Sequence, residues 1–154
     1  MGRPHKQAAV IAYRVDGEHF EIALVRKSNG RGWTVPKGSL DRGESGGDAA
    51  VREAEEEAGL IGELTRDPIG RYCYSKQNER YHVDVYVLRV TIVLESWREA
   101  AHRRRRWMAV EEAMERLRPE LHGLVETVRT AQSPIRRRQG AASDRLAASL
   151  AGTW

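Results

Sequence analysis

The 154-residue chain has one cysteine, Cys73, so its fold cannot depend on an internal disulfide bond. It also has no apolar segment of the roughly 20 residues that a membrane-spanning helix requires. The N-terminus lacks an apolar segment followed by a cleavage site. We therefore expect a cytoplasmic protein that does not interact with a membrane.

The sequence has no second histidine or cysteine at metal-binding spacing from His82 or His102, which excludes the usual zinc sites. Internal repeats are also missing. A length of 154 residues is enough for one domain with a hydrophobic core and too short for two ordinary domains. We expect this domain to span residues 1–132. A mobile basic tail, residues 133–154, is expected to follow it and contains Arg136, Arg137 and Arg138.

What the sequence does contain is an acidic segment, residues 38–60, with glycine, arginine and glutamate in a fixed order. The order follows the pattern G-x5-E-x7-R-E-U-x-E-E-x-G-U, in which U is an aliphatic residue. All of the fixed positions match, which arises by chance on the order of once in 10^8 registers. The U positions hold Ala54, which is smaller than usual, and Leu60. The fixed positions are Gly38, Glu44, Arg52, Glu53, Glu56, Glu57 and Gly59.

Residues 45–58 of this segment are expected to form a helix with one binding face and one packing face. At about 100° per residue, Glu53, Glu56 and Glu57 share one arc, and Glu55 points elsewhere into solvent. Neighbouring glutamates repel one another on a bare helix. Mg2+ or Mn2+ would offset that repulsion, because both prefer hard oxygen ligands. The arc expected to pack against a sheet holds Gly47, Ala50, Val51, Ala54 and Ala58.

The helix alone permits a second interpretation, in which the glutamates are solvated and pair with Arg52. Gly38, Glu44 and Gly59 stand in register with the helix, which favours the metal site. Ser45 is expected to cap the start of the helix, and Gly59 is expected to end it in a left-handed conformation. A backbone carbonyl at Gly38 could face the metal.

The remaining sequence predicts an α/β fold in which helices cover both sides of a mixed β-sheet. Segments rich in Val, Ile, Leu or Tyr alternate with turn residues before and after the acidic helix. Two further helices follow, the second beginning near Pro119. The predicted strands are residues 7–15, 20–26, 69–74 and 81–93, and residues 33–38 are expected to form a short strand or extended segment. The later helices are residues 110–117 and 121–131.

Positive charge is concentrated in the second part of the chain. Residues 1–97 contain 14 basic and 15 acidic side chains, whereas residues 98–154 contain 12 basic and 7 acidic ones. Arginine binds phosphate oxygens through two parallel hydrogen bonds, so the run of residues 103–106 indicates a polyanionic substrate. The alternative is that these arginines are solvated or paired with nearby acids. Those acids are Glu95, Glu99, Glu111 and Glu112.

The acidic pattern resembles the Nudix box of pyrophosphohydrolases, which implies the Nudix fold with an α/β/α arrangement. Residues 81–97, the arginine run ending at Trp107 and residues 111–117 resemble the diphosphoinositol polyphosphate phosphohydrolases, a Nudix subfamily. Members of that subfamily also cleave diadenosine polyphosphates. The resemblance therefore implies an Mg2+-dependent hydrolase, with Mn2+ as a possible substitute, that cleaves a phosphoanhydride bond in a phosphorylated small molecule.

The resemblance also assigns roles to individual residues. Glu56 is expected to be the general base, with Arg52 and Glu53 completing the catalytic group. Other acids outside the box are candidates for an additional ligand or base: Glu79, Asp84, Glu95 and Glu99. The implied metal ligands are Gly38, Glu53, Glu56 and Glu57, and the implied substrate-binding residues are Lys37, Arg103, Arg105, Lys6, Arg26, Lys27 and Ser28.

The chain departs from the subfamily at two positions. Lys37-Gly38-Ser39 replaces a run of glycines, and the basic N-terminal cluster is reduced to Lys6 followed by Gln7. Two other functions therefore stay open, namely an enzyme or binder directed at the 5′ end of RNA and a ligand sensor without catalysis. Trp33 and Trp107 could stack on a nucleic-acid base or pack in the core. The sequence does not indicate an oligomeric state.

Overall fold

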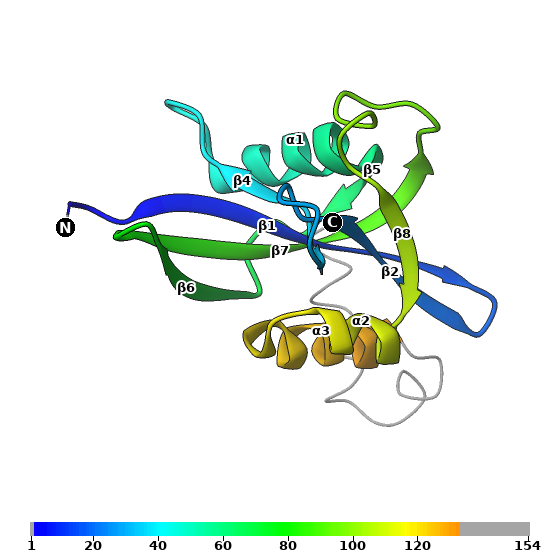
Figure 1. Cartoon of the computed structure of the whole chain (residues 1–154). Helices are drawn as coiled ribbons and strands as arrows, with labels where there is room; N and C mark the ends of the chain where they lie inside the picture. The colour runs from blue at the N-terminus through cyan, green and yellow to red at the C-terminus, as the bar shows by residue number, and fades with distance from the viewer. Residues whose placement is uncertain (1, 133–154) are drawn as a thin grey trace.

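The computed structural model describes residues 2–132, and the predicted basic tail, residues 133–154, lies outside them. Figure 1 shows a twisted sheet with helices on both of its sides. In chain order the elements are β1 (His5–Asp16), β2 (His19–Arg26), β3 (Trp33–Thr34), β4 (Lys37–Ser39), α1 (Gly46–Ala58), β5 (Leu60–Leu64), β6 (Gly70–Lys76), β7 (Glu79–Val93), β8 (Arg105–Ala109), α2 (Val110–Arg116) and α3 (Pro119–Gln132).

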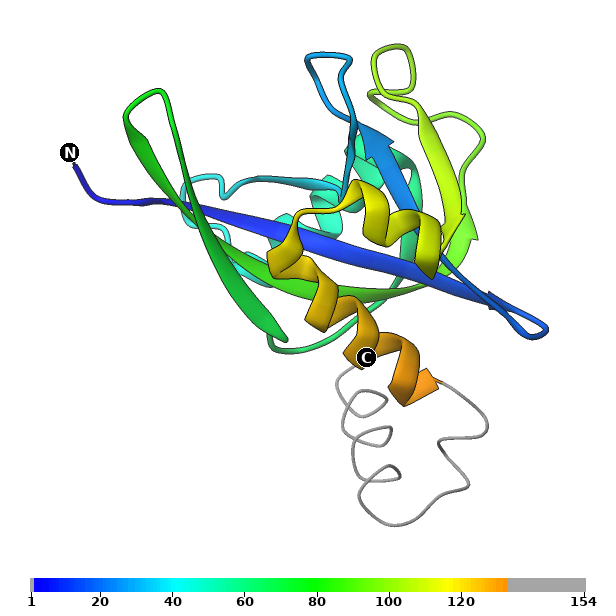
Figure 2. The ribbon, with the colours of Figure 1, turned by 60° about the horizontal axis from the view of Figure 1, so that its bottom comes forward.

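The sheet is built around a parallel pair, β1 and β7, to which all its other strands connect. β2 and β4 pair with β1 in antiparallel fashion, and β5 and β6 pair with β7 in the same way. β8 and β3 extend the sheet beyond β2. α1 covers one face, and α2 and α3 cover the other (Figures 1 and 2). The predicted mixed sheet between helical layers is confirmed.

Alternating residues of β1 supply both hydrophobic cores, as the two-residue period of a strand requires. Ile11 and Tyr13 pack on the α2–α3 side. Ala8 and Ala12 pack on the α1 side, against Ala54 and other alanines of the helix. Small residues on both surfaces let α1 lie close to the sheet, so the carboxylates of α1 are held near the edge formed by β4.

The helix α1 begins and ends where the sequence predicts. Ser45 accepts a hydrogen bond from the backbone N–H of Asp48 at 3.1 Å, and Gly59 is left-handed with φ 66°. The prediction that Val51 packs against the sheet is wrong, because its side chain is 47% exposed. Only the alanine side of α1 contacts the sheet, and Val51 lies outside this narrow contact.

Two strands, β5 and β8, were not predicted. β5 carries a register shift between Ile61 and Gly62, so its side chains do not alternate regularly. β8 begins within the arginine run, and only Met108 among its residues is buried. Its pattern is therefore that of a charged surface segment. None of the helices within residues 2–132 is both long and apolar enough to cross a membrane.

Candidate active site

Arg52 is the centre of an ion-pair network that joins α1 to the loop before it. Its guanidinium donates to both carboxylate oxygens of Glu44 at 2.9 Å and to the carbonyl oxygen of Ser39 at 3.0 Å. It also donates to Glu53 at 2.8 Å and to Glu56 at 3.3 Å. The hydrogen bonds from Arg52 lower the pKa of Glu44 to about 2. Arg52 therefore positions the loop and two carboxylates at once.

Glu53 and Glu57 form a buried carboxylate pair on α1. Their exposed fractions are 8% and 5%. The backbone N–H of Lys37 donates to Glu57 at 3.3 Å, and a Cβ at Gly38 would collide with the carboxylate of Glu53. Burial raises the pKa of Glu57 to about 8, Arg103 opposes the rise, and the Glu53 carboxylate adds to it. The pair thus concentrates negative charge in a place that water reaches poorly.

This donor set fits a hard divalent cation. Both members of the pair offer oxygen ligands, and a cation would offset the cost of burying the Glu57 carboxylate, which raises its pKa, and the added repulsion from Glu53. Glu56 is oriented differently, because its two oxygens accept from Arg52 and from Arg98. In residues 2–132 no three His, Cys, Asp or Glu side chains converge as ligands. The structure therefore brings Glu53 and Glu57 together, while Glu56 lies beside them and is bound by Arg52 and Arg98.

The segment between β7 and β8 holds the C-terminal end of α1. Trp97 donates from its ring nitrogen to the carbonyl oxygen of Glu57 at 2.8 Å. Arg105 donates to the carbonyl oxygens of Ala58 at 2.7 Å and Leu94 at 2.9 Å, and its guanidinium lies 4.3 Å from the Trp97 ring. These contacts satisfy carbonyls that a helix end leaves unpaired.

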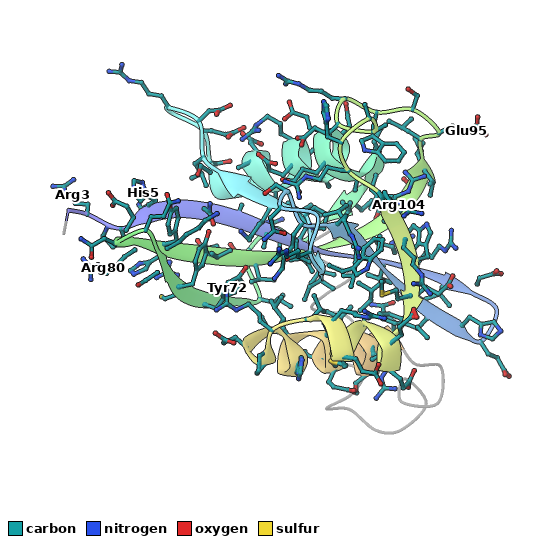
Figure 3. The ribbon with its side chains drawn as sticks, viewed as in Figure 1. Arg3, His5, Tyr72, Arg80, Glu95 and Arg104 are labelled. Carbon is teal, nitrogen blue, oxygen red and sulfur yellow. The ribbon has the colours of Figure 1, made fainter. Side chains whose placement is uncertain are left out.

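A cavity of about 410 Å³ opens beside the buried pair on the α2–α3 side of the sheet. Figure 3 shows Tyr72 of its wall on that side. Glu57 is the one carboxylate among its described lining residues. The cations that line it come from five separate segments and are Lys27, Lys37, Lys76, Arg103, Arg116 and Arg118.

Cations cover the aromatic faces in this cavity. The Arg118 guanidinium lies 4.5 Å from the ring of Tyr72 and 5.5 Å from that of Tyr74. The Lys37 ammonium lies 5.0 Å from the Tyr74 ring and donates to its hydroxyl at 3.3 Å. Burial lowers the pKa of Lys37, and Glu57 opposes this. The Nε of Arg118 is buried and has no hydrogen-bond partner among the described residues.

Comparison with known proteins identifies the family. Residues 4–128 match the NUDIX domain. The chain belongs to the Nudix family. It is 39% identical over 112 residues to diphosphoinositol polyphosphate phosphohydrolase 2 of Mus musculus, covering 71% of this chain and 60% of the mouse protein. The chain thus spans less than two thirds of that relative.

Solved structures agree with this Nudix assignment. The crystal structure of the C. elegans Ap4A hydrolase superposes with a TM-score of 0.68 and 25% identity, over 80% of this chain and 95% of the nematode chain. A binary complex of a C. elegans Ap4A hydrolase gives a TM-score of 0.66 and 27% identity, over 79% and 93% of the two chains.

Only some of the predicted substrate-binding residues lie beside the glutamates of the Nudix box. Lys27, Ser28, Lys37 and Arg103 line the cavity beside Glu57. Arg103 lies 3.7 Å from a Glu57 oxygen and donates to the carbonyl oxygen of Arg26 at 2.8 Å.

The other three predicted substrate residues lie outside the cavity. The guanidinium of Arg26 lies over the Trp33 ring at 5.2 Å, and Arg105 supports the end of α1. Lys6 lines a separate groove.

Sequence reasoning missed several polar residues of the cavity wall. Arg116 ends α2 and Arg118 directly precedes α3, while Asn29 lies on the turn after β2 and Lys76 ends β6. The only signal in the sequence is the pair of arginines directly before Pro119. Acids proposed as additional ligands take other partners: Glu79 pairs with His5, Asp84 with Arg71 and Glu99 with Arg103, while Glu95 lies outside the cavity (Figure 3).

Proposed function

We propose that this Nudix protein is an Mg2+-dependent pyrophosphohydrolase that cleaves a phosphoanhydride bond in a highly phosphorylated small molecule. Mn2+ would serve in place of Mg2+. One observation carries the proposal: Glu57 of the buried carboxylate pair lines a cavity whose other charged lining residues are all cations. Such a wall favours a ligand with several phosphates, because each guanidinium or ammonium stabilises anionic oxygens.

Residues of the Nudix box divide the chemistry among them. Glu53, Glu57 and the Gly38 carbonyl would hold Mg2+, with Glu56 as a further ligand. Bound Mg2+ supplies neutralisation of phosphate charge and an acidified water. Glu56 accepts the proton of the attacking water. Arg52 and Arg98 keep the Glu56 carboxylate oriented, at 3.3 and 2.8 Å from its two oxygens.

Cations of the cavity would bind and orient the phosphates. Arg103 stands 3.7 Å from Glu57, so a phosphate that it binds lies next to the reacting bond. Lys37, Lys27 and Arg118 extend the same wall away from that point. Developing charge on the phosphate oxygens is stabilised by these fixed groups, which need no rearrangement during the reaction.

A diphosphoinositol polyphosphate is the substrate that this wall favours. Arg118 covers the Tyr72 ring and Lys37 lies beside the Tyr74 ring, so neither ring offers a bare face for a nucleobase. A phosphorylated polyol needs no such face. The mouse relative is named for this substrate class. Diadenosine polyphosphate is the second candidate, favoured by the likeness to the nematode Ap4A hydrolase.

The alternatives have less support. Binding an RNA backbone would need a continuous basic surface. The side chains of the arginine run, residues 103–106, instead point alternately inward and outward. Arg103 is enclosed with 16% of its side chain exposed, and Arg106 is 51% exposed and paired with Glu112. A sensor without catalysis would be expected to lack box glutamates, whereas all are present.

Incubation with a panel of substrates, followed by product identification, tests the proposal. The panel contains diphosphoinositol polyphosphates, diadenosine polyphosphates, nucleoside diphosphate sugars and triphosphorylated RNA, each with Mg2+ or Mn2+. We expect turnover of the first class above the second. If none of the compounds is hydrolysed with either metal, the proposal that the protein is an enzyme is rejected. If only RNA is hydrolysed, the proposal of a small-molecule substrate is rejected.

A further inference from the structure

A second groove, here called the N-terminal groove, lies on the α1 side of the sheet. Its volume is about 670 Å³. Its wall combines the first residues of β1, the start of α1 and the β6–β7 pair. Figure 3 shows Arg3 of this wall at the N-terminal end of β1. The residues that matter here are Arg3, Lys6, Gly46, Arg71, His82 and Tyr86.

Tyr86, a largely buried residue, directs an unpaired hydroxyl into this groove. The residue is 6% exposed, and its hydroxyl lies against Gly46, where any Cβ would collide with it. No residue in the described part of the chain forms a hydrogen bond with this hydroxyl. Burial and the nearby Asp84 raise the pKa of Tyr86, so the hydroxyl keeps its proton and can donate. It is therefore open to a ligand that enters the groove.

The start of α1 adds backbone donors at the same place. Ser45 satisfies the N–H of Asp48, and Ala49 bonds to the carbonyl of Ser45. The N–H groups of Gly46 and Gly47 have no acceptor within residues 2–132. Free N–H groups and the helix dipole together attract an anion to a helix N-terminus.

Charge in the N-terminal groove is positive after pairing. Its two carboxylates are already occupied, since Arg52 binds Glu44 and Arg71 binds Asp84 at 2.7 Å. Lys6 has no ion-pair partner in the described chain, and β-sheet register places it beside His82. The groove therefore offers donors and cations whose acceptors must come from a ligand.

We propose that the N-terminal groove binds a phosphomonoester, separate from the substrate cavity. Its phosphate accepts from the N–H groups of Gly46 and Gly47, from the Tyr86 hydroxyl and from Lys6. Arg3 and Arg71 face the rest of the ligand, for which the groove has ample room. Because Glu44 joins this groove to Arg52, the bound ligand is one side chain removed from the network of the box glutamates.

Titration of the full chain by 15N NMR tests the site, with inorganic phosphate in one arm and adenosine monophosphate in the other. We expect both to shift the amides of Gly46 and Gly47, and the monoester to bind more tightly. Tyr86→Phe and Lys6→Gln should each weaken binding about tenfold, since each removes one hydrogen bond to a charged group. Thermal melting reports whether either variant is folded, and the exposed Lys6 site should not affect folding.

Arg103→Met is the matched control, because it removes a cation from the other cavity. Binding at the groove should stay unchanged in it. Phosphate shifts that vanish in Arg103→Met but survive in Lys6→Gln would overturn the proposal, since they would place the anion in the substrate cavity. Unmoved Gly46 and Gly47 amides in both arms would overturn it as well.

Discussion

The two ends of α1 are held in opposite ways. At the C-terminal end, Trp97 and Arg105 bind the carbonyls of Glu57 and Ala58, and the N–H of Glu99 binds the carbonyl of Glu56. At the N-terminal end Ser45 caps the helix, and the N–H groups of Gly46 and Gly47 have no acceptor among residues 2–132. The end that carries the reacting carboxylates is thus fixed by its neighbours, while the other end is open to a ligand.

Helix electrostatics explains why the C-terminal end needs this support. The last turn of a helix carries partial negative charge, and α1 places Glu56 and Glu57 there without a basic residue of its own. Positive charge comes instead from Arg103 and Arg105, which precede or begin β8. The following predictions test this difference between the ends.

The largest effect is expected from Glu57→Gln. It removes one carboxylate of the buried pair, and with it a ligand for Mg2+, so kcat should fall by about a thousandfold. Glu55→Gln is the matched control, since it makes the same change two residues away on the exposed side of α1. The rate of product formation by both variants checks this. An equal loss of kcat in the two would contradict the assignment of Glu57 as a ligand for Mg2+.

Gly38→Ala should disturb the same pair from the β4 side. Its Cβ would displace the Glu53 carboxylate, so we expect kcat to fall by about a hundredfold. Gly123→Ala is the comparison, because its Cβ meets nothing within 4 Å and it lies in the exposed middle of α3. That variant should gain about 0.5–1 kcal/mol of stability in urea unfolding. A fully active Gly38→Ala would show that the close packing is not needed.

Arg105→Lys should loosen the C-terminal end of α1 without changing net charge. Lysine is shorter than arginine and lacks the planar guanidinium that lies over the Trp97 ring, so the contacts with Ala58 and Leu94 should weaken and the free energy of unfolding should fall by about 1–3 kcal/mol. Arg104→Lys, at an exposed neighbour in the same run, should change it little. Urea unfolding of both variants measures the difference, and equal stabilities would mean that the contact is not needed.

The smallest effect concerns pH and the loop before α1. Arg52 lowers the pKa of Glu44 from 4.5 to about 2, so the ionised side chain stabilises the folded state. This contribution is complete above pH 4.5 and disappears as the pH falls towards 2. The melting temperatures of the parent and of Glu44→Gln, measured between pH 7 and 2, should therefore converge as the pH falls. A constant difference in melting temperature over this range would contradict the lowered pKa of Glu44.

The residues that the sequence placed correctly are those whose partners lie close by along the chain. Ser45 and Gly59 bound α1 because capping depends on one or two turns of backbone. Glu53 and Glu57 share one side of α1 because they are one turn apart. Arg52 reaches Glu56, which lies one turn further along the helix.

The cavity wall could not be found in this way. Lys76 and Arg118 reach it from separate elements, and their convergence depends on how β6 pairs with β7 and how α3 packs on the sheet. Arg105 was expected to bind substrate, but its register in β8 turns it towards α1. Strand register and helix packing are long-range properties that the local pattern does not contain.

The alternation of the arginine run has an evolutionary consequence. Arg103 and Arg105 are enclosed, whereas Arg104 and Arg106 are exposed. Insertion or deletion of a single uncharged residue before β8 would exchange the two pairs and leave all four arginines and the net charge as they were. Evolution in this segment should therefore tolerate changes in charge more readily than changes in length. Homologues that keep four basic residues but change their spacing should bind different ligands.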